Sequence, residues 1–264
     1  MSLTAPTSTA ISADLVSKAE SYARASMSVS TMRAYTSAWR TFSRWCRTSG
    51  LDPLPAAPEV VAQYVTHRAD TGMKVSTIAS DQAAIAAAHR AVGLDSPTAS
   101  PVVKTVMRGV RRSVGTAPKP KTPVLVTELR RMVLAIPDSN RGIRDHAVLV
   151  VGFAGAFRRS EIAALDLSDL IFTDEGVRVV LRRSKTDQEG RSRAVGLPFG
   201  SHPTTCPVRV LTRWIRLAGF EAGPVFRSID RADRITATTM SSRAVARAVK
   251  RAAKEAGIDP STVS

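Results

Sequence analysis

The sequence predicts a mainly helical protein: a helical N-terminal domain, then an α+β domain with a small three-stranded antiparallel sheet. Three observations lead to this prediction. Apolar residues recur with a helical period up to Val114. A stretch rich in proline and lysine follows at 116–123, typical of an extended, basic linker between domains. Beyond it, strand-like runs occur only between Leu170 and Leu197, with helical patterns on both sides.

The composition is that of a globular, strongly basic chain. Its 264 residues suffice for one large domain or two of ordinary size, and 44% hydrophobic residues support proper cores. Lys and Arg number 38 against 22 Asp and Glu, with 13 against 7 up to Pro118 and 25 against 15 after it. Nucleic acid is the default partner, because neutralised phosphates release counterions. General Arg-rich residue usage is the alternative that charge alone leaves open.

Several other classes of protein do not fit. No secretory signal is visible at the N-terminus, and the longest apolar stretch, Ala147 to Phe157, is too short to span a bilayer. We therefore expect a cytoplasmic protein without a membrane partner. Cys46 and Cys206 are too few and too far apart for a disulfide framework or a metal site, and Cys46 falls on an apolar helix face as a core thiol.

The N-terminal part is predicted to be a disordered lead-in at 1–11 and a helical domain at 12–115. From about Ala13 we expect five helical segments, whose boundaries follow from capping and turn residues. These boundaries are Ser30 or Thr31 and Gly50 for the second helix, Pro58 and Gly72 for the third, Ser76 and Gly93 for the fourth, and Pro101 for the start of the fifth.

Two of these helices carry a basic stripe opposite an apolar face. In the second helix the stripe is Arg33, Arg40, Arg44 and Arg47, against Tyr35, Ala38, Trp39, Phe42, Trp45 and Cys46. In the fifth it is Lys104, Arg108, Arg111 and Arg112, against Val106, Met107, Val110 and Val114. One such stripe is usually a solvated face. Two stripes almost free of carboxylates favour a DNA-facing surface.

The C-terminal domain, expected at 124–264, combines helices with three short strands. The predicted helices begin at Thr127, cover Asn140 to Phe157 and Arg159 to Leu165, and return at Pro207 to Ala218 and Ser241 to Ala256. The predicted strands are Leu170 to Thr173, Val177 to Leu181 and Arg193 to Leu197, with turns at Asp174 to Gly176 and Asp187 to Gly190.

Three motifs stand in this domain in a fixed order. They are the run Gly155-Ala-Phe-Arg-Arg-Ser-Glu-Ile162, the pattern Leu-X-X-X-Asp-Leu at 165–170 and a Lys-Thr hairpin at 185–186. Preceded by a helical domain and a basic linker, this order resembles the tyrosine recombinase (phage integrase) family, over about Ser12 to Ser264. The resemblance implies a SAM-like core-binding domain followed by a catalytic domain that uses no cofactor.

The resemblance also implies catalytic roles. Arg158 corresponds to a catalytic arginine that grips the scissile phosphate, where a planar guanidinium suits bidentate contact. Glu161 corresponds to the acidic residue that orients this arginine, and Lys185 to the hairpin lysine that protonates the leaving 5′-hydroxyl. Ordinary alternatives are a helix-start salt bridge for Arg158, a capping glutamate for Glu161 and a solvated turn lysine for Lys185. Arg159 is expected to be a surface or ion-pair residue.

DNA contacts are implied in the same way. The resemblance places these residues at double-stranded DNA: Thr31, Arg33, Arg40, Ser76, Thr77, Ser80, Arg108, Arg111, Arg112, Ser242, Arg243 and Arg247. Arg243 could read guanine in a major groove, and the fifth-helix arginines would contact phosphates. The Ser and Thr residues could instead be N-caps, and the arginines non-specific phosphate contacts.

The sequence departs from the family at its end. No His is followed by Arg three residues on, and the tyrosines are Tyr22, Tyr35 and Tyr64, so the family's nucleophilic Tyr has no counterpart. We therefore expect an incomplete catalytic domain, and the resemblance implies that it uses no metal.

We expect a site-specific recombinase or integrase that binds DNA without cleaving it. The family acts as a tetramer on a partly symmetric site, through a phosphotyrosyl intermediate. The main alternative is a non-catalytic accessory or antagonist that occupies recombination sites. A type IB topoisomerase shares the chemistry but fits the first domain and the linker less well.

Overall fold

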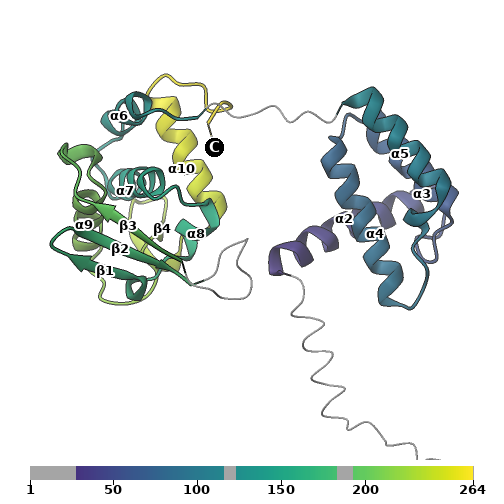
Figure 1. Ribbon diagram of the computed structural model, residues 1–264, viewed down its shortest axis with the longest axis horizontal. Helices are drawn as coiled ribbons and strands as arrows, with labels where there is room; N and C mark the ends of the chain where they lie inside the picture. The colour runs from purple at the N-terminus through teal and green to yellow at the C-terminus, as the bar shows by residue number, and fades with distance from the viewer. Residues whose placement is uncertain (1–27, 116–122, 183–192, 264) are drawn as a thin grey trace, which may run out of the picture. The chain divides into compact units, whose positions relative to one another are not determined.

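The computed structural model describes residues 28–115, 123–182 and 193–263, and the chain divides into two compact units between Pro118 and Lys119 (Figure 1). Several predictions lie outside the described residues. They are the lead-in at 1–11, the first helical segment, most of the linker at 116–123, the turn at 187–190 and Lys185. Each unit is described by itself below.

The first unit is helical throughout its described part. Its elements are α2 (Val29–Thr48), α3 (Pro58–Asp70), α4 (Val75–Ala91), a short 3-10 turn η1 (Pro97–Ala99) and α5 (Pro101–Val114). Helix α2 packs on α4, and α3 packs on α5. Their core gathers Phe42, Cys46, Tyr64 and Ile85, all at most 1% exposed, so the apolar face predicted for α2 is confirmed.

Two predicted N-caps in this unit are wrong. Ser28, and not Ser30 or Thr31, caps α2: its hydroxyl accepts the Thr31 N–H at 3.1 Å, so the helix begins before the predicted caps. Ser76 lies inside the first turn of α4, where Lys74 occupies the cap position without a side-chain bond. Met73 and Val75 pack on the core cluster of Val65, Ile78 and Met107 there, so burial outweighs the preference for a serine cap.

The second unit is built around α7 and a small sheet (Figure 1). Its helices are α6 (Val126–Leu134), α7 (Asn140–Ala154), α8 (Arg159–Ala164), α9 (Pro207–Ala218) and α10 (Ser242–Glu255), with 3-10 turns η2 (Leu167–Asp169) and η3 (Pro203–Thr205). Its strands are β1 (Leu170–Thr173), β2 (Gly176–Leu181), β3 (Arg193–Pro198), β4 (Arg227–Ile229) and β5 (Ile235–Thr239). Helix α7 contacts both α9 and α10.

The predicted fold class, mainly helical with a three-stranded antiparallel sheet, is confirmed. The sheet has the order β1-β2-β3, with Leu170 paired to Val179 and Val179 to Val195. A second, two-stranded sheet of β4 and β5 was not predicted, because β4 has only three residues and β5 has Ile235 as its only large apolar residue. Trp214 on α9 is fully buried in the core, and its indole N–H donates to the Val225 carbonyl at 2.8 Å.

The basic stripes keep their predicted exposure. Arg33, Arg40, Arg44 and Arg47 on α2 are exposed, and so are Lys104, Arg108, Arg111 and Arg112 on α5. One apolar partner on α5 was assigned wrongly: Val114 is 49% exposed. It stands in the last helical turn, before Gly115 turns the chain away with φ of 79°, and it belongs to neither core cluster of the described first unit.

Candidate functional site

Arg158 occupies a tightly constrained connection between α7 and α8. Ala156 has a positive φ of 47°, an uncommon conformation for a residue with a Cβ. Phe157 then turns its ring back over Gly155, where an added Cβ would lie 2.3 Å from the ring. Phe157 is buried and Arg158 is exposed, so this corner anchors the chain on one side and presents the guanidinium on the other.

Glu161 fixes Arg158 through its carboxylate. Oε2 accepts the Arg158 backbone N–H at 2.8 Å, and Oε1 accepts the guanidinium Nη1 at 2.8 Å. The Glu161 side chain is 2% exposed, whereas that of Arg158 is 46% exposed. The carboxylate therefore holds the arginine from its buried side. On the exposed side, the guanidinium presents N–H donors to a ligand.

A shallow, open hollow surrounds the exposed end of Arg158. Its lining residues are Phe157, Arg158, Arg159, Ser160, Ser242 and Arg243. Helix α8 packs on α10, which brings residues about eighty positions apart to one place. Ser241 caps α10 by accepting the Ala244 N–H at 3.2 Å, and Ser242 and Arg243 follow in its first turn. Three arginines and a helix N-terminus make the hollow suited to an anion.

Two further arginines stand at one end of the three-stranded sheet, where β2 ends and β3 begins. Arg193, the first residue of β3, places Nη2 at 4.0 Å from Glu161 Oε2. Arg182, which follows β2, places Nε at 2.5 Å from Asp169 Oδ1 and donates to the Ser168 hydroxyl. Neither arginine was predicted from the sequence. The strand register could have indicated Arg193, because it shares a sheet face with Val195 and Leu197.

The structure brings together only part of the predicted site. Arg158, Glu161, Ser242 and Arg243 lie together, and Arg247 is exposed further along α10. Lys185 lies outside the described residues. Arg159 is exposed at the edge of the hollow, as expected of a surface residue.

The predicted DNA-facing residues of the first unit are largely accessible. Arg33, Arg40 and Arg44 line one hollow along α2 with Thr36, Ser37 and Thr41. Thr31 is half-buried, and its hydroxyl lies 2.9 Å from that of Ser28. On α4, Ser76 and Ser80 are exposed and Thr77 is half-buried.

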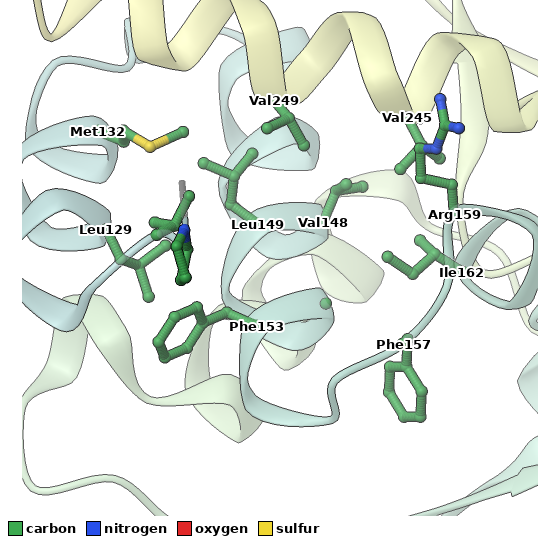
Figure 2. A pocket seen from close by; sticks show the side chains of 13 residues that line it. Leu129, Met132, Val148, Leu149, Phe153, Phe157, Arg159, Ile162, Val245 and Val249 are labelled. Carbon is green, nitrogen blue, oxygen red and sulfur yellow. The ribbon is translucent and has the colours of Figure 1, made fainter. Parts of the chain in front are cut away.

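A second hollow of the C-terminal unit is apolar and unsuited to a charged ligand. Figure 2 shows it between α6, α7 and α10, with Leu129, Met132, Leu149 and Val249 in its wall. Arg159 stands at its edge and also lines the Arg158 hollow, so the two hollows adjoin.

Over the described ranges, no group of three or more His, Cys, Asp or Glu side chains is arranged to hold a metal ion. Within the same ranges, no helix combines the length and apolar character needed to cross a membrane.

Comparisons with known proteins agree with this architecture. Over 233 residues the chain is 36% identical to an integrase/recombinase XerD homologue of Selenomonas ruminantium, covering 87% of this chain and 68% of that protein. It is 27% identical over 209 residues to the recombinase Cre of Escherichia phage P1, covering 76% of this chain and 59% of that protein.

Two solved structures share the fold. A λ integrase dimer bound to a COC′ core site aligns with a TM-score of 0.54 and 17% identity, covering 93% of this chain and 78% of that one. The Tn1549 transposon integrase in complex with transposon right end DNA aligns with a TM-score of 0.57 and 14% identity, covering 90% and 77%. The model of the phage integrase family matches residues 124–264. This chain therefore belongs to the phage integrase family.

Proposed function

We propose that this chain binds double-stranded DNA as part of a site-specific recombinase and holds one backbone phosphate at Arg158. The observation that carries the proposal is the Arg158–Glu161 pair, in which a buried carboxylate presents a half-exposed guanidinium to an open, basic hollow. Arg158 would donate to the non-bridging oxygens of the phosphate and stabilise charge that develops there. The λ and Tn1549 integrase structures are both complexes with DNA, which supports the choice of partner.

In this proposal the basic helices supply sequence-independent affinity. The exposed arginines of α2, α5 and α10 would neutralise further phosphates along the duplex, and Arg243 would reach a base edge or an adjacent phosphate. Lys185 would act as the general acid toward the leaving 5′-hydroxyl. A partly symmetric site occupied by several copies is the arrangement that we propose for the assembly.

We further propose that these 264 residues bind DNA without cleaving it. Tyr64 is unsuited to attack a phosphate, because it is 1% exposed, its hydroxyl donates to Asp81 at 3.3 Å, and burial raises the pKa of its phenol, with the nearby Asp81 adding to this effect. Tyr35 is half-buried on α2, and Tyr22 lies outside the described residues. Binding without cleavage is also what the second candidate function requires, that of a non-catalytic protein that occupies recombination sites.

Salt-dependent binding tests the DNA proposal. Anisotropy of a labelled duplex, measured across a salt series, should give a negative slope of log affinity against log salt concentration. Arg40→Gln and Arg158→Gln should each reduce the slope by about 0.9, the share of one phosphate contact. Arg234→Gln is the control, because Arg234 is exposed but already paired with Asp230 at 2.9 Å. An affinity that does not change with salt would contradict the proposal.

Cleavage is tested separately. The chain is incubated with a nicked suicide substrate and resolved on a denaturing gel, where we expect no covalent protein–DNA adduct. An adduct would overturn the proposal that these residues only bind.

A further inference from the structure

We propose that Arg193 is a second phosphate-contacting residue of the Arg158 site, so that two guanidinium groups around one carboxylate grip the same phosphodiester. The inference rests on the proposed function and deepens it. Arg193 comes from β3 and Arg158 from the start of α8, and Glu161 lies between them.

The strand register explains why Arg193 points toward the site. Arg193 pairs with Leu181 across the β2–β3 ladder, and directly paired residues share one face of a sheet. Leu181 and Leu197 on that face are buried in the core. Arg193 is therefore a charged residue on the core-facing side, at the end of the strand nearest α8. Its 54% exposure shows that this end of the sheet opens to solvent.

Among the described residues, Glu161 bonds to Arg158 and leaves the N–H donors of Arg193 available. Both carboxylate oxygens already accept hydrogen bonds of 2.8 Å from Arg158. The 4.0 Å between Arg193 Nη2 and Glu161 Oε2 is an electrostatic contact, too long for a hydrogen bond. Arg193 is thus attracted to the site by Glu161 while its N–H donors stay available, and a guanidinium offers them in the planar fork that phosphate oxygens accept.

The charge balance indicates an anion. Arg158, Arg193 and Glu161 together carry one net positive charge, and the lining of the adjoining hollow adds Arg159 and Arg243 without any acidic residue. A phosphodiester carries one negative charge and two non-bridging oxygens. It can therefore accept hydrogen bonds from both Arg158 and Arg193 and balance the net charge of Arg158, Arg193 and Glu161.

The experiment compares Arg193→Gln with Arg178→Gln in the full chain, by the same duplex-binding measurement. Arg178 is the matched control: it is an exposed arginine of the same sheet, pairs with Gly196 and lies on the opposite face from Leu181. We expect Arg193→Gln to weaken binding roughly tenfold, the size of a lost charge-assisted contact, and Arg178→Gln to leave it unchanged. Arg193→Lys should keep the salt slope, since it keeps the charge. Circular dichroism melting checks that each variant is folded.

The double variant tests whether the two arginines share one phosphate. In the Arg158→Gln background the loss from Arg193→Gln should be clearly smaller than tenfold, because the freed Glu161 carboxylate then draws Arg193 away from the ligand. Losses that multiply independently would overturn the shared phosphate. A folded Arg193→Gln that behaves like Arg178→Gln would overturn the inference while the proposed function stands. If Arg158→Gln also has no effect, the proposed function and the inference both fail.

Discussion

Glu161 holds Arg158 at two points, the backbone N–H and the guanidinium, each at 2.8 Å, from a position where only 2% of its own side chain is exposed. One buried side chain thus caps the short helix α8 and aims the arginine that we place at the phosphate. The stability of the unit and the function that we propose thus depend on the same carboxylate, and this link can be measured.

Replacing Glu161 by Gln should destabilise the C-terminal unit by about 1–3 kcal/mol, because a buried amide makes weaker bonds to the guanidinium than a carboxylate does. Urea unfolding followed by Trp214 fluorescence, in a Trp39→Phe and Trp45→Phe background, reports on this unit alone, since the chain has three tryptophans. Glu175→Gln, at an exposed turn, is the control and should change stability by less than about 0.5 kcal/mol. Equal effects of the two variants would contradict the buried-anchor role.

Asp145 should be far more important for stability than an ordinary surface carboxylate. Its two oxygens contact Arg144 and Arg251 at 2.6 Å each, and the Arg144 and Asp145 side chains are 5% and 7% exposed. Burial lowers the pKa of Arg144 even beside this partner, so desolvation is already costly there. Asp145→Asn leaves Arg144 without its charged partner, and we expect a loss of about 3–5 kcal/mol in the same urea experiment.

Asp138→Asn provides the comparison for Asp145. Asp138 is paired with Arg213 at 2.8 Å, but the two side chains are 82% and 54% exposed, so its loss should cost at most about 1 kcal/mol. If the two variants were equally stable, the Arg144–Asp145–Arg251 cluster would not anchor α10 to α7.

His146 should make the C-terminal unit less stable at mildly acidic pH. Burial lowers the pKa of its imidazole, and Nε2 lies 2.6 Å from the Thr204 carbonyl oxygen. The unfolded chain, with the ordinary value of about 6.5, then binds the proton more readily than the folded one. The contribution is fully present above about pH 6.5 and is lost as the pH falls toward the lowered folded value. His146→Gln should lose less stability than the wild type between neutral and acidic pH, whereas exposed His202→Gln should follow the wild type.

Cys46 should be unreactive in the folded protein. It is 0% exposed, and burial, reinforced by Asp52, raises its pKa to about 11, so the reactive thiolate is scarce at neutral pH. Cys206 is equally buried. We expect negligible labelling by a thiol reagent of the native protein and two equivalents after unfolding in urea. Rapid labelling of the native protein would show that these cores open readily.

Local sequence patterns predicted much of the fold because their causes are local. The 3.6-residue period located the described helices, and strand-like alternation located β1 to β3. Where packing competes with a local preference, the predicted helix start was wrong. Lys74, and not Ser76, occupies the cap position of α4, because Met73 and Val75 pack against the core. The β4–β5 pair escaped prediction because β4 has only three residues and β5 only one large apolar residue, so neither shows a clear strand pattern.

By itself the sequence determined the Arg158–Glu161 pair, since residues three apart at a helix start are neighbours whatever the rest of the chain does. Only the tertiary structure decided that Arg193 approaches the same carboxylate, that Ser242 and Arg243 line the same hollow, and that Arg251 reaches Asp145. Those residues are separated by tens of positions along the chain. Their proximity follows from sheet register and helix packing, which depend on how the whole core is buried and not on any local pattern.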